Sequence, residues 1–225
     1  MLALPDSSAG LATMMATRAI LSFLLMSLFA SCLYDKKGDY ERDQLFLALV
    51  ASSQGGACNS TGSPGSFTGE VDASSSTAWT QCDFATGSAV TGTSNAWELR
   101  FQRFKIGSNG GVSGSGNAAV CRTGQTNLAN VTSVSGLGST CVFTVDTNVS
   151  GSAAGGAAVT FTGNSLLADW YNYDENTHIL SAKPDVYIVR SGETPAKYYK
   201  FQMLDYYNST GTSGFPRLRW AEVLF

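Results

Sequence analysis

His178 is the sole histidine of the sequence, so it is the only imidazole available for acid–base, nucleophilic or metal chemistry. A serine nucleophile would need it as a base, yet no G-x-S-x-G turn presents such a serine. The neighbouring carboxylates Asp174 and Glu175 are adjacent, and adjacent residues of a strand face opposite sides. With Asp169 and His178 they form either a calcium or metal site or, as we favour, a solvated turn. We therefore expect neither an enzyme nor a metal site.

Cysteine supplies the second kind of chemistry. Besides Cys32, the chain has four cysteines, namely Cys58, Cys82, Cys121 and Cys141. Their spacing lacks the C-x-x-C pairs and histidine partners of a zinc site. Residues 1–31 predict export, and an even number of cysteines in an exported protein indicates two disulfides, with three connectivities open. We favour Cys58–Cys82 and Cys121–Cys141 because the members of each pair are near in sequence.

The N-terminal region predicts export. Arg18 precedes an apolar run of about a dozen residues that is too short to span a bilayer, which is typical of a secretory signal. The run ends in Phe29-Ala30-Ser31-Cys32, which resembles the lipobox of bacterial lipoproteins. We interpret residues 1–31 as a lipoprotein signal peptide and Cys32 as the lipid attachment site, an ordinary signal peptide being the alternative. The expected location is the bacterial outer membrane or cell surface, with the membrane bound through the lipid.

The remaining sequence favours strands. We assign residues 32–66 to a lipidated tether with one short helix, and residues 67–225 to an all-β domain. Only 14% of residues are charged and the net charge is −3, which gives no reason to expect a nucleic-acid partner. Short alternating segments separated by Gly, Asn and Ser predict an antiparallel β-sandwich or irregular barrel.

Nine strands are expected in all. One starts at Trp97, and its alternation shifts phase by one residue after Gln102, which we interpret as a β-bulge. The other eight lie at 78–85, 117–123, 140–146, 156–162, 168–173, 185–191, 197–207 and 215–223.

Several ordered motifs resemble the HmuY family. They are Val71-Asp72-Ala73-Ser74, Trp97-Glu98-Leu99-Arg100-Phe101-Gln102-Arg103, the glycine-rich loop 108–116, and four aromatic segments between Trp170 and Phe215. The resemblance covers about residues 68–223. It implies an HmuY-like all-β surface lipoprotein that binds haem and passes it to an outer-membrane transporter.

The haem ligands implied by the resemblance are incomplete. The family prototype uses two histidines, and the position that matches one of them, five residues after Trp170, is Glu175. His178 is the remaining imidazole, with Met203 or a tyrosine as a poorer second ligand. The alternatives are that His178 is a surface turn residue and that Met203 fills the core. Two functions stay open: a haem-binding or haem-relaying lipoprotein, and a surface interaction or adhesion lipoprotein that binds a host protein without haem.

Overall fold

The computed structural model describes residues 58–63, 66–91, 94–152 and 158–225. The predicted signal peptide, Cys32 and the short helix of the tether lie outside these residues. Among the described residues, no helix is long and apolar enough to cross a membrane.

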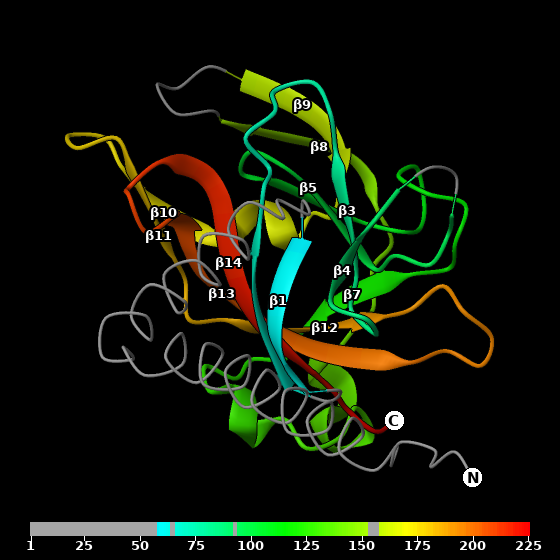
Figure 1. Cartoon of the computed structure of the whole chain (residues 1–225). Helices are drawn as coiled ribbons and strands as arrows, with labels where there is room; N and C mark the ends of the chain where they lie inside the picture. The colour runs from blue at the N-terminus through cyan, green and yellow to red at the C-terminus, as the bar shows by residue number, and fades with distance from the viewer. Residues whose placement is uncertain (1–57, 64–65, 92–93, 153–157) are drawn as a thin grey trace, which may run out of the picture. The chain divides into compact units, whose positions relative to one another are not determined.

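One large antiparallel sheet forms the body of the domain and curls into a nearly closed barrel (Figure 1). Its ten strands, in spatial order, are β6 (Lys105–Ser108), β5 (Leu99–Gln102), β3 (Thr80–Asp83), β4 (Ser88–Val90), β1 (Cys58–Ser63), β2 (Ser66–Val71), β14 (Ser213–Glu222), β13 (Tyr198–Tyr207), β12 (Val186–Arg190) and β7 (Ala119–Arg122). The all-β, barrel-like fold expected from the sequence is confirmed.

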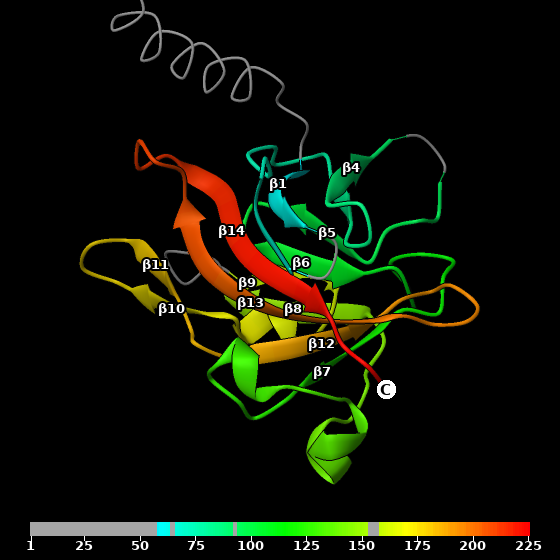
Figure 2. The ribbon, with the colours of Figure 1, turned by 60° about the horizontal axis from the view of Figure 1, so that its bottom comes forward.

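Two separate hairpins accompany this sheet. The first pairs β8 (Thr147–Ser152) with β9 (Ala158–Gly163), and the second pairs β10 (Tyr171–Asp174) with β11 (Ile179–Ala182). Both hairpins extend toward the same side of the barrel (Figures 1 and 2). Three short 3-10 helices, η1 (Leu128–Asn130), η2 (Ser135–Thr140) and η3 (Leu167–Asp169), lie in the connections.

The main core fills the inside of the barrel. Alternate residues of each strand point inward, as in β12, where Tyr187 and Val189 belong to this core. Phe84 stacks on Trp220 at its centre, with ring centroids 4.7 Å apart. The indole of Trp220 donates a hydrogen bond to the carbonyl of Phe84 at 2.9 Å, so its one polar group is satisfied inside the core.

A second, smaller core covers part of the outer face. Val186 and Ile188 of β12 point outward and pack with Val131 and Val134 from the segment that carries η1 and η2. The disulfide Cys121–Cys141 links this segment to β7. Both faces of β12 are therefore buried, which explains its continuous apolar sequence.

The two edge strands of the large sheet are covered by other parts of the chain. On β7, Val120 exchanges backbone hydrogen bonds of 2.8 and 2.9 Å with Thr144. On β6, the carbonyl of Ile106 accepts from the backbone of Asn164, and the amide of Ser108 donates to the carboxylate of Asp146 at 2.7 Å. Loop segments thus hydrogen-bond to backbone groups on the free edge of each strand.

The structure corrects three expectations. The domain begins before residue 67, because β1 pairs along its length with β2 and residues 58–63 therefore belong to the sheet. No strand forms across 140–146, where η2 ends and Thr144 makes a single bridge. The phase shift after Gln102 is a tight hairpin, not a bulge, since β5 pairs with β6 across the two-residue turn Arg103–Phe104.

The cysteine pairs agree with the expectation. Cys58 joins Cys82, and Cys121 joins Cys141. The first bridge links β1 to β3, which lie on either side of β4. The second attaches the outer cover described above.

Candidate functional site

The hairpin β10–β11 carries His178 and the family-matched position Glu175, so it is the candidate site. Aromatic residues fix its base on the barrel. The indole of Trp170 donates to the carbonyl of Phe104 at 2.9 Å, and the ring of Tyr171 lies edge-on to both residues. The amide of Leu180 donates to the phenol oxygen of Tyr207 at 3.0 Å. The base is therefore held by packing and by hydrogen bonds.

The tip of the hairpin is organised by Asp174. Its carboxylate accepts from the amide of Asn176 at 2.8 Å, and its carbonyl accepts from the amide of His178 at 2.8 Å. The hydrogen bond from the Asn176 amide to the carboxylate, followed by those from Thr177, holds the pKa of Asp174 below its usual value. His178 closes the turn in the left-handed region, with φ of 58°.

His178 is exposed and paired with Tyr173. The phenol oxygen of Tyr173 lies 2.5 Å from Nδ1 of His178, and the two ring centroids are 6.0 Å apart. Within the part of the chain that the structure describes, no group hydrogen-bonds to Nε2. When Nδ1 carries the proton and donates it to Tyr173, Nε2 presents its lone pair to solvent, as a metal-binding imidazole requires.

Met203 lies in a different environment. Its side chain is 2% exposed and belongs to the main core, on β13 opposite Leu218. His178, in contrast, is exposed at the hairpin tip. The structure therefore does not bring these two candidate ligands to one surface.

Asp169, the third carboxylate considered for a metal site, is held at the hairpin base. It accepts from Lys183 Nζ at 2.5 Å and from Arg122 Nη2 at 3.3 Å. The hydrogen bond from Lys183 is the main reason that the pKa of Asp169 is lowered. Because these two cations already neutralise Asp169, it does not join the carboxylates at the tip.

Tyr173 is the residue beside His178 that sequence reasoning did not single out. In the sequence it lies in the first of the four aromatic segments between Trp170 and Phe215. The short spacing between Tyr173 and His178 could have indicated their contact. A turn that pairs Asp174 with Ile179 brings position 178 back toward the end of β10. Pairing of the phenol with the imidazole follows from that short turn.

The side chains at the tip of the hairpin are of types that can ligate haem iron. An imidazole nitrogen and a phenol oxygen are both ligand types found on haem iron. Ligation by two histidines within this chain is excluded, because the chain has one. The tip therefore offers one strong neutral ligand, with Tyr173 fixing its orientation.

Comparisons with known proteins agree on one family. The family model described as HmuY protein matches residues 75–220. No curated protein matches the chain.

Three solved structures share the fold. A Bacteroides vulgatus protein named HmuY-like and heme-binding is 20% identical, with a TM-score of 0.56 over 73% of this chain and 96% of that one. A Bacteroides fragilis protein named as a lipoprotein is 20% identical, with a TM-score of 0.53 over 74% and 95% of the two chains. The apo form of a Tannerella forsythia HmuY analog is 16% identical, with a TM-score of 0.51 over 70% and 95%.

Proposed function

Because the chain belongs to the HmuY family, we propose that it is an exported, lipid-anchored protein that binds haem at the tip of hairpin β10–β11. His178 Nε2 would ligate the iron, and the phenol oxygen of Tyr173 would accept a hydrogen bond from Nδ1–H and so orient the ring. Haem, when bound, supplies the iron that this imidazole ligates. The names of the similar proteins from Bacteroides vulgatus and Bacteroides fragilis support haem binding and lipidation as the starting hypotheses.

One observation carries the proposal. The only imidazole of the chain is exposed, and a hydrogen bond at Nδ1 orients it while Nε2 stays open. A metal-binding histidine usually donates the N–H of its other ring nitrogen to a protein group in this way.

Lipid attachment at Cys32 and delivery of haem to an outer-membrane transporter are parts of the same proposal. They rest on the lipobox-like sequence and on the family, respectively. The lipid would keep the domain at the membrane surface, where a transporter is accessible.

Haem titration followed by absorbance tests the site. The parent should show a saturable Soret shift without the spectrum of bis-imidazole haem. His178→Ala should weaken binding at least tenfold, because no other imidazole can replace it. Tyr173→Phe should weaken it less, since the ligand remains but its orientation is lost. Glu175→Gln is the matched control, as it changes an exposed residue of the same turn and keeps His178.

Two results would contradict the proposal in different ways. Equal Soret responses of the parent and His178→Ala would remove His178 as the ligand. No response from the parent would remove haem binding itself and favour the alternative, a surface interaction lipoprotein that keeps the HmuY-like scaffold.

A further inference from the structure

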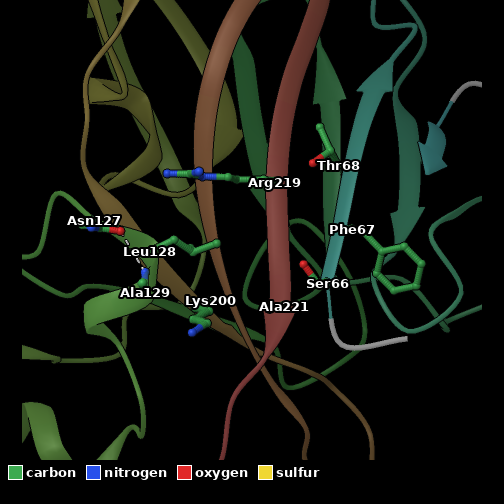
Figure 3. Close-up of a pocket in the computed structure, with 9 residues that line it drawn as sticks. All are labelled: Ser66, Phe67, Thr68, Asn127, Leu128, Ala129, Lys200, Arg219 and Ala221. Atoms are coloured by element: carbon green, nitrogen blue, oxygen red, sulfur yellow. Dashed lines mark hydrogen bonds between the residues drawn. The ribbon is translucent and has the colours of Figure 1, made fainter. Parts of the chain in front are cut away.

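A groove of about 460 Å³ lies on the outer face of the sheet, over strands β2, β14 and β13 and beside η1 (Figure 3). It is separate from the hairpin that carries His178. Its lining residues are Ser66, Phe67, Thr68, Asn127, Leu128, Ala129, Lys200, Arg219 and Ala221. Its volume falls in the range typical of sites for small organic molecules.

The groove has two positive charges and no negative one. Lys200 and Arg219 come from the neighbouring strands β13 and β14, and none of the lining residues is a carboxylate. The next outward cation on β14, Arg217, differs because it forms an ion pair with Asp205. Among the described residues, Lys200 and Arg219 form no ion pair. Their charges are therefore left for a ligand.

Arg219 is fixed in position by a buried amide. Gln202 is 4% exposed, and its Nε2 donates to the carbonyls of Thr126 and Pro184 at 2.9 and 2.7 Å. These two bonds leave Oε1 to accept from Nε and Nη2 of Arg219 at 3.0 and 2.6 Å. The guanidinium therefore keeps one orientation without a ligand, with its remaining N–H groups free to donate.

Lys200 is held beside it. Its Nζ donates to the carbonyl of Val131 at 2.7 Å, which uses one of its three N–H groups. Burial lowers the pKa of Lys200, and no carboxylate acts to raise it. The ammonium is thus partly desolvated and unpaired, so a bound anion would stabilise its charged form.

We propose that this groove binds the phosphate monoester of an organic ligand. A phosphate monoester carries a charge of about −1.5 to −2 near pH 7, which matches two unpaired cations. Its oxygens can accept from the remaining N–H groups of Arg219, from Lys200 and from the hydroxyls of the exposed residues Ser66 and Thr68. Leu128 and Ala221 give the apolar contacts for the organic part (Figure 3). This site does not depend on haem binding.

Isothermal titration calorimetry of the full chain with hexyl phosphate tests the proposal. The parent should bind hexyl phosphate, with hexanoate at least fivefold weaker and hexanol silent. Arg219→Gln should raise the Kd for hexyl phosphate at least tenfold, and Lys200→Met should do the same. Arg217→Gln is the matched control, since it removes an already paired cation from the same strand, and it should change the Kd less than twofold.

Thermal unfolding gives a second measurement that does not require heat of binding. Hexyl phosphate should raise the Tm of the parent and of Arg217→Gln, but not that of Arg219→Gln. Vesicles containing phosphatidic acid, compared with phosphatidylcholine alone, separate a lipid source of the phosphate from a soluble one. The proposal would be overturned if the parent did not bind hexyl phosphate. It would also be overturned if Arg219→Gln and Arg217→Gln lost affinity for hexyl phosphate equally.

Discussion

Replacing Glu98 by Gln should stabilise the folded domain at neutral and alkaline pH. Glu98 is 3% exposed, and one carboxylate oxygen accepts from the amide of Phe84 at 2.7 Å. Burial raises the pKa of Glu98 from 4.5 to about 7, against the opposing effect of the Phe84 amide. Above that pH the carboxylate is ionised while buried, which destabilises the folded state.

The sign of the pH dependence follows from these two values. The folded chain keeps the proton of Glu98 up to about pH 7, whereas the unfolded chain releases it near 4.5. Between these values the folded state binds more protons, so the free energy of unfolding falls as pH rises and levels off above about 7. At 1.36 kcal/mol for each pH unit, the total loss is about 3 kcal/mol.

Glutamine keeps an oxygen that can accept from Phe84 and carries no charge. We expect Glu98→Gln to be about 3 kcal/mol more stable than the parent at pH 8, and to match it within about 1 kcal/mol at pH 4. Urea unfolding at pH 4, 6 and 8, with both disulfides intact, measures this. Glu175→Gln, which changes an exposed carboxylate, is the control. Parallel stability curves for the parent and Glu98→Gln across this pH range would refute the reasoning.

Three further changes test other parts of the structure. Met203→Leu keeps the core filled, so it should lower the free energy of unfolding in urea by less than about 1.5 kcal/mol and leave the haem titration unchanged. Loss of the Soret response would instead make Met203 a ligand. Replacing Cys121 and Cys141 together by Ser should lower the free energy of unfolding by about 3 kcal/mol in the same assay, because the bridge closes a loop across a separation of 20 residues. An unchanged urea midpoint would contradict this. Cys32→Ala should release the protein from membranes in fractionation, whereas unchanged detergent partitioning would exclude lipid attachment there.

The sequence predicted the long strands well, and the reason is their alternation. β12 and β13 lie within segments expected to be strands, and β14 overlaps the expected segment 215–223 but already begins at Ser213. Each of the three buries a regular set of side chains against a core. β1 was missed because Cys58–Ser63 is polar and glycine-containing, and its strand conformation depends on pairing with β2. Pairing with a neighbour leaves no pattern within the segment itself.

The segment 140–146 shows the opposite error. Its residues Val142, Phe143 and Val145 are of types that favour strands, yet Val142 and Val145 are exposed. The segment instead supplies Cys141 to the disulfide and Thr144 to the edge of β7. Residue type alone could not distinguish a strand from a chain that crosses the outside of a barrel.

Of the candidate site, the sequence identified His178 but not its surroundings. The absence of a histidine at Glu175 is visible in the sequence alone. The hydrogen bond to Tyr173 and the burial of Met203 depend on the hairpin turn and on the direction of β13, which only the folded chain defines. The groove of Lys200 and Arg219 likewise joins residues from distant parts of the sequence.

The covered edges of the large sheet bear on how this protein behaves at high local concentration. Open edge strands recruit strands from other molecules and begin aggregation. Here Thr144 occupies the free side of Val120, and Asn164 and Asp146 occupy that of β6. Copies that the proposed lipid anchor brings close together would meet with these backbone groups already hydrogen-bonded. These parts of the two edges therefore offer no template for a neighbour's strand.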